Sequence, residues 1–176
     1  RLEAVFLAAT GRGGEGVQLA RALVERFASP RYASIKVVFE RAYWAGVGKV
    51  AWMAGDGAAV REAAQRLLPP TRPQEWLFTD LVRPTLQAQV AMLDRRWEEA
   101  GRQLEVALRT FERVRFPQGH ADPRLLAACV QRMLGRREEA WSRLEPVLAE
   151  CLEEDAIGPL ACEPSWVTDA VLEVIP

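Results

Sequence analysis

Histidine is almost absent from this 176-residue sequence, in which His120 is the only one. A single imidazole and scattered thiols do not make a metal site. No serine or cysteine lies near His120 in the sequence to complete a pair of nucleophile and base. We therefore interpret His120 as a surface-loop residue, and we predict no catalytic residues, no bound metal and no cofactor.

Cysteine is also scarce, and its pattern is uninformative for disulfides. The three cysteines, Cys129, Cys151 and Cys162, are odd in number and form no Cys-x-x-Cys motif, which is typical of a reducing compartment. No apolar run approaches the roughly 18 residues of a membrane span, and the N-terminus lacks the order of a signal peptide. We predict a cytoplasmic protein that makes no membrane contact.

Neither sign of charge dominates. With 23 basic and 24 acidic side chains the net charge is −1, which gives no overall field to hold nucleic acid or an anionic membrane. We predict no direct nucleic acid contact by this segment. The 49% hydrophobic content suits one compact domain or one short solenoid. We expect a single domain over residues 1–176, and a start at Arg1 leads us to expect a fragment of a longer chain.

An internal repeat is the main feature that is present. The stretch 92–108 (MLDRRWEEAGRQLEVAL) recurs forty positions later in 134–148 (LGRREEAWSRLEPVL), and a weaker copy lies forty positions earlier at 53–60. A period of about forty residues is typical of stacked helical hairpins.

Apolar rows support this period. A small residue at one position of each first helix would let a neighbouring helix approach closely. The second helices carry apolar residues at i, i+4, i+7 and i+8, which is the spacing of one buried face. The rows are Gly48/Ala88/Ala128 and Val50/Val90/Val130 on the first helices, and Val60/Ala100/Ala140, Ala64/Leu104/Leu144, Leu67/Ala107/Val147 and Leu68/Leu108/Leu148 on the second.

Helix boundaries can be placed from caps and prolines. We predict an exposed elbow at 69–73, a third hairpin that starts near Thr79 or Asp80, and Pro84 in a first turn. Asp122 followed by Pro123 predicts the start of a fourth hairpin, and 163–165 (EPS) should begin a last helix over 166–174.

The openings of two second helices, Trp97-Glu-Glu-Ala100 and Arg137-Glu-Glu-Ala140, resemble the tetratricopeptide family. More narrowly, 45–52 (AGVGKVAW) with Gly55-Asp56, and 156–164 (AIGPLACEP), resemble the repeat domain of MalT/LuxR-type transcriptional regulators. The resemblance implies an all-α, right-handed solenoid of about four antiparallel hairpins. It also implies a non-catalytic sensing or regulatory module. In that family an ATP-binding switch domain precedes the repeats and a helix-turn-helix follows them.

A binding groove is predicted on the side of the first helices that packing leaves free. Its candidate residues are Arg41, Lys49, Trp52, Gln89, Met92 and Arg132, with Leu125 and Cys129 in the same row. An exposed tryptophan beside basic side chains would anchor a partner. We predict a protein, a peptide or a small-molecule effector as that partner, and possible self-association through exposed terminal repeats.

Two alternatives stay open. One is a free-standing repeat adaptor that scaffolds other proteins. The other is a nucleotide-dependent enzyme, because Gly11-x-Gly13-x-x-Gly16 matches the dinucleotide fingerprint, with 4–9 as a strand before it and 35–40 as a second strand. The same residues also fit a helix, a glycine-rich turn and a helix, as in the later repeats.

Overall fold

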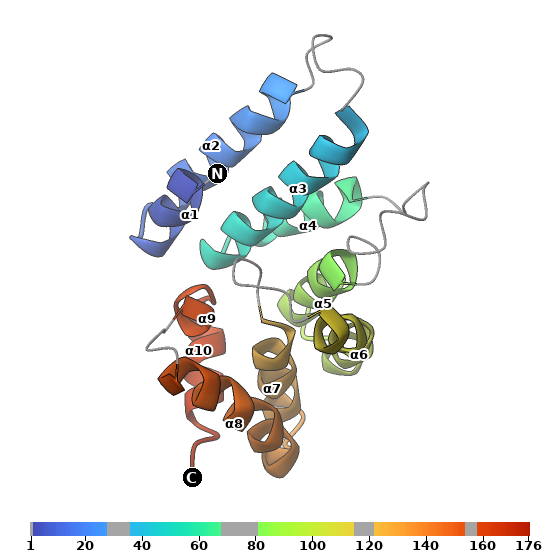
Figure 1. The fold of residues 1–176 in the computed structure, drawn as a ribbon, viewed down its shortest axis with the longest axis vertical. Helices are drawn as coiled ribbons and strands as arrows, with labels where there is room; N and C mark the ends of the chain where they lie inside the picture. The colour runs from blue at the N-terminus through green and yellow to red at the C-terminus, as the bar shows by residue number, and fades with distance from the viewer. Residues whose placement is uncertain (1, 28–35, 68–80, 115–121, 154–157) are drawn as a thin grey trace. The chain divides into compact units, whose positions relative to one another are not determined.

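The structure is a computed structural model, and it describes residues 2–27, 36–67, 81–114, 122–153 and 158–176. Within these ranges every regular element is a helix, and helices hold 84% of the residues. The all-α prediction is therefore confirmed. The helices are α1 (Leu2–Ala9), α2 (Gly13–Phe27), α3 (Lys36–Met53), α4 (Gly57–Arg66), α5 (Arg83–Leu93), α6 (Trp97–Val114), α7 (Pro123–Met133), α8 (Arg137–Glu153), α9 (Gly158–Ala161) and α10 (Ser165–Leu172) (Figure 1).

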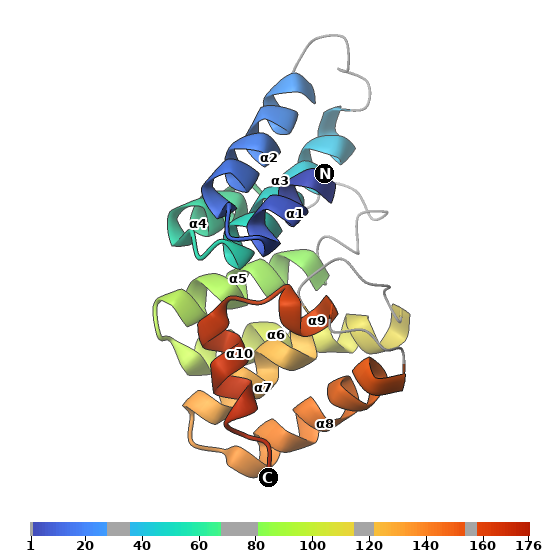
Figure 2. The same ribbon diagram turned by 90° about the vertical axis from the view of Figure 1, so that its left-hand side faces the viewer.

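The chain divides into two compact units, an N-terminal unit over Arg1–Phe78 and a C-terminal unit over Thr79–Pro176. The N-terminal unit holds α1 to α4, where each helix packs on the next and α1 also packs on α3. In the C-terminal unit α5 packs on α6, α6 on α7 and α7 on α8, while α10 runs beside α7 (Figure 2). The single domain and the solenoid expected over residues 1–176 stay predictions.

One turn closes each of the four helix pairs α1–α2, α3–α4, α5–α6 and α7–α8. Its central residue has a left-handed backbone: Gly11, Gly55, Arg95 and Gly135, with φ of 81°, 70°, 57° and 78°. The next N–H donates to the carbonyl five residues earlier: Arg12 to Leu7 at 2.8 Å, Asp56 to Ala51 at 2.9 Å, Arg96 to Ala91 at 2.8 Å and Arg136 to Gln131 at 2.9 Å. This is the Schellman pattern, which satisfies the last carbonyls of the first helix.

The residue that completes this turn also opens the second helix. Asp56 is the N-cap of α4, because its Oδ1 accepts the N–H of Ala59 at 3.0 Å. Arginine stands at this position in the other three turns and cannot accept such a bond. Arg12 instead forms an ion pair with Glu15 at 2.6 Å, and Arg96 pairs with Glu99 in the same i, i+3 arrangement.

Most residues of the predicted core rows are buried. Val60, Ala100 and Ala140 are fully buried, as are Leu104 and Leu144. The small row Gly48/Ala88/Ala128 is buried throughout, and so is Leu67/Ala107/Val147. The exceptions are Val90, Ala64 and Leu148, which are half-buried. Leu68 lies outside the described residues.

Most predicted boundaries are also confirmed. Pro84 lies in the first turn of α5, and Asp122 caps α7 by accepting the N–H of Arg124 at 2.9 Å. The last helix, α10, begins at Ser165 as expected but ends at Leu172 rather than at residue 174. The predicted elbow at 69–73, the start near residues 79 and 80, and His120 all lie outside the described residues.

Candidate partner-binding surface

The predicted groove is not an exposed strip. Trp52 and Met92 are each 1% exposed, Gln89 is 2% exposed and Arg41 is 8% exposed. The remaining two residues, Lys49 and Arg132, are half-buried. The prediction of an exposed tryptophan anchor is therefore wrong.

On two of the first helices, α3 and α7, the physical reason is that the helix has several neighbours. Trp52 lies on α3, which packs against α1, α2 and α4. Likewise α7 packs against α6, α8 and α10, and its residues from Leu125 to Val130 are all buried. A helix surrounded on three sides has no apolar side left for solvent, so its i, i+4, i+7 row becomes core.

On α7 the predicted row faces another helix of the same chain. Leu125, Cys129 and Arg132 share one stripe by their i, i+4, i+7 spacing. Burial raises the pKa of the Cys129 thiol to about 12, and the negative charge of Glu163, just before α10, adds to the rise. Arg132 Nη2 forms an ion pair with Glu173 Oε2 at 2.7 Å. Arg132 therefore pairs with the α10 segment, and the charge of Glu163 beside that segment acts on Cys129.

The α10 segment buries one narrow apolar stripe. Val167, Val171 and Val174 are essentially fully buried, and they follow the same i, i+4, i+7 spacing. The opposite side faces solvent, where Leu172 is 48% exposed. Just beyond the helix, the Ile175 carbonyl accepts a hydrogen bond from Arg137 Nη2 at 3.3 Å.

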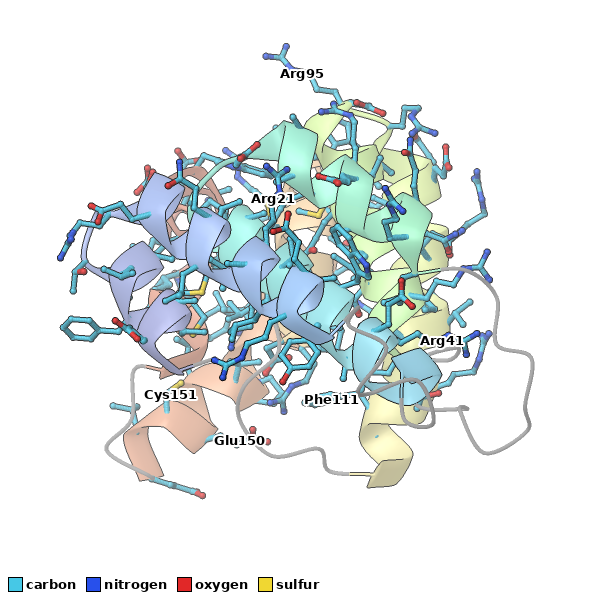
Figure 3. The ribbon with its side chains drawn as sticks, turned by 90° about the horizontal axis from the view of Figure 1, so that it is seen from above. Arg21, Arg41, Arg95, Phe111, Glu150 and Cys151 are labelled. Atoms are coloured by element: carbon cyan, nitrogen blue, oxygen red, sulfur yellow. The ribbon has the colours of Figure 1, made fainter. Side chains whose placement is uncertain are left out.

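A charge cluster that the sequence did not reveal joins α6, α7 and α8. Arg124 forms two hydrogen bonds with each of two carboxylates: Nη1 and Nη2 donate to Glu150 at 2.7 and 2.6 Å, and Nε and Nη2 donate to Asp122 at 3.2 and 2.8 Å. Its guanidinium carbon lies 5.0 Å from the centre of the Phe111 ring, and Figure 3 labels Phe111 and Glu150.

Hydrogen bonds from Arg124 to Glu150 and Asp122 raise the pKa of that guanidinium above its ordinary value, against the effect of burial. Its hydrogen bonds are made to carboxylates of the same chain. We therefore interpret the cluster as a structural contact that holds α6, α7 and α8 together. The sequence predicted the role of Asp122 as a cap before Pro123. It did not predict the contact of Glu150 with Arg124, because the two residues lie 26 positions apart.

The glycine motif packs two helices together. Residues 4–9 belong to α1 and α3 begins at Lys36, so neither segment is the strand that the dinucleotide fingerprint requires. Gly16 lies so close to α1 that a Cβ atom would stand 2.6 Å from the carbonyl oxygen of Ala4. A Cβ on Gly13 would stand 2.5 Å from that of Ala54. Both glycines therefore allow a close approach between protein segments.

In the described part of the chain no group of three or more His, Cys, Asp or Glu side chains could hold a metal ion. Among the same residues, none of the helices combines the length and the apolar character needed to cross a bilayer.

No family model matches the chain, and no curated protein or solved structure matches it.

Proposed function

We propose that the chain is a non-catalytic, partner-binding module built from helix hairpins. The recurrence of one hairpin carries the proposal: four turns share the same left-handed residue and the same bond to the carbonyl five residues earlier. Equivalent rows such as Val60, Ala100 and Ala140 are buried in each of the last three hairpins. Arrays of such units present extended surfaces, and binding is their usual role.

The charged side chains support the same proposal, because many of them join helices. Arg21 on α2 pairs with Glu62 on α4 at 2.6 Å, and Arg143 on α8 pairs with Glu105 on α6 at 2.5 Å. Such half-exposed pairs add little stability. They link successive second helices, as an array of stacked hairpins requires.

A sensing or regulatory role is the form of this proposal that we favour, within a cytoplasmic transcriptional regulator of the MalT/LuxR type. It rests on the resemblance of the repeat openings. The coding sequence on both sides of this segment is the test: an ATP-binding switch domain before it and a helix-turn-helix after it would support the regulator. Their absence would favour the free-standing adaptor.

The binding proposal itself is tested by selection from a phage-displayed library of helical peptides, followed by calorimetric titration. We expect selected peptides to bind with micromolar or better affinity, while ATP and NAD give no binding heat. Failure to select any peptide, together with tight binding of either nucleotide, would overturn the proposal and restore a nucleotide-dependent activity.

A further inference from the structure

We infer that the face of α7 covered by α10 is the helix-binding surface of this module, and that α10 occupies it until a partner helix of the same chemistry displaces it. The inference rests on the proposed function, because it names the surface and the partner that a binding module would use.

The first support is that α10 departs from the packing of the repeats. Earlier in the chain, α3 packs chiefly on the second helix before it, α2, and less on the first helix α1, while α7 packs on the second helix α6. The start of α10 resembles that of α7, since Glu163-Pro164 follows Asp122-Pro123 by 41 positions. Yet α10 packs on the first helix, α7, rather than chiefly on the second helix that precedes it, α8. It therefore lies where a ligand of the first helices would lie.

The second support is the match between the two surfaces. The buried valine stripe belongs to α10, which packs on α7, and on α7 the residues Leu125 and Cys129 are fully buried. At the edge of the contact Arg132 pairs with Glu173. This is the pattern by which an amphipathic helix docks in a groove, with apolar anchors at i, i+4 and i+7 and a charge pair that fixes its register.

The third support is that α10 is poorly secured. It has eight residues, and helices of that length are marginal in water without tertiary contacts. Its ion pair with α7 is solvent-exposed on both sides, so salt screens it. Ile175, just after the helix, is 40% exposed.

The surface beneath α10 is secured independently. Helix α7 is held by α6 and α8, and the cluster around Arg124 joins those three helices without any residue of α10. Removal of α10 would therefore uncover a preformed apolar face with Arg132 at its edge. The chemistry of the partner follows from α10, the helix that covers this face. The partner should carry β-branched or other apolar side chains at i, i+4 and i+7, and a carboxylate at i+6.

The Cys129 thiol is the probe for release of α10. In a full-length protein with Cys151→Ser and Cys162→Ser, only Cys129 can react with a maleimide or a disulfide reagent. We expect Glu173→Arg to raise its modification rate several-fold, because like charges then meet at this edge, and Arg132→Glu added to Glu173→Arg to restore the slow rate. Asp169→Arg makes the same charge reversal on an exposed position of α10, and it should leave the rate within 2-fold of the parent.

Binding in trans completes the test. A fluorescent peptide of residues 163–176 is titrated into the parent and into Val171→Asp, whose α10 should be undocked. We expect the variant to bind it at least 10-fold more tightly, as measured by anisotropy, and a peptide with Val167→Asp not to bind. The Glu173→Arg protein is the second host if the far-ultraviolet spectrum shows that Val171→Asp has lost its fold.

Two results would overturn the inference. One is a Cys129 rate that does not respond to Glu173→Arg. The other is equal or absent binding of the peptide to parent and variant. Either result would leave the proposed function standing if library selection still yields peptide ligands, because those ligands would then bind another face.

Discussion

Arg95 and Gly135 occupy the same position in two successive hairpin turns, and both have a left-handed backbone, with φ of 57° and 78°. Each donates its N–H to the carbonyl three residues earlier, at 3.0 Å in both turns. Arg95 is the one described residue other than glycine with a positive φ, and its side chain points away from the helices (Figure 3). The arginine thus bears a backbone strain that glycine avoids.

Arg95→Gly should therefore stabilise the C-terminal unit. The left-handed conformation costs a residue with a Cβ about 1 to 2 kcal/mol, and the greater freedom of glycine in the unfolded chain offsets about half of that. We expect a net gain of about 0.5 to 1 kcal/mol in the free energy of unfolding by urea. Gly135→Ala is the matched control and should lose about 1 kcal/mol. A loss in both variants would show that the Arg95 side chain contributes more than its backbone costs.

The glycine motif gives a second matched pair. Gly16→Ala places a Cβ against the backbone of α1, so α1 and α2 must move apart, which we expect to cost about 1 to 3 kcal/mol. Gly14 lies on the same helix, and a Cβ there meets nothing within 4 Å. Gly14→Ala should be neutral or stabilise by up to about 1 kcal/mol. Thermal unfolding followed by circular dichroism compares the stabilities of the two variants. A Gly14→Ala protein less stable than Gly16→Ala would contradict the packing role of Gly16.

The buried row of the second helices predicts a third pair. Leu104 is fully buried on α6, so Leu104→Ala should lower the free energy of unfolding by about 2 to 5 kcal/mol through lost transfer energy and a residual cavity. Glu98 is exposed in the first turn of the same helix. Glu98→Ala removes only a contact with the helix dipole and should cost less than about 1 kcal/mol. Chemical denaturation that ranked Glu98→Ala as the more damaging change would contradict the repeat register.

The buried thiol predicts a pH dependence. Because burial holds the pKa of Cys129 near 12 in the folded protein, against an ordinary value of 9.0, the unfolded chain releases this proton first. The unfolded state then binds fewer protons, and stability falls as pH rises through that window. Between about pH 8 and about pH 10 the parent should lose about 1.4 kcal/mol more than Cys129→Ala does.

Guanidinium denaturation at the two pH values measures this difference, and the subtraction removes other groups that titrate in the same range. An equal loss in parent and variant would mean that the thiol ionises in the folded state as readily as in the unfolded chain.

Much of the local structure was predictable from the sequence, because it depends on residues close together in the chain. The forty-residue period placed Leu104 and Leu144 in the core, since a helix buries residues at i, i+4 and i+7 whatever covers them. Asp122 before Pro123 predicted the start of α7 from the chemistry of one turn. The same local reasoning allowed both a strand and a helix for residues 4–9, and the structure shows that they belong to the helix α1.

The predicted groove failed for a related reason. Periodicity shows that Trp52 and Met92 share a row of the first helices, but not whether another helix lies over that row. The Arg124 cluster was hidden in the same way, because its partner Glu150 comes from the far end of α8.

By itself the sequence determined the helical class, the hairpin period and most of the residues that form the buried rows. Each follows from side-chain type and spacing, which act within one or two helical turns. Only the tertiary structure decided that α10 packs on α7, that Arg132 pairs with Glu173, and that Cys129 is fully buried. Those contacts join residues up to 41 positions apart, and the burial of a helical face depends on which distant segment covers it.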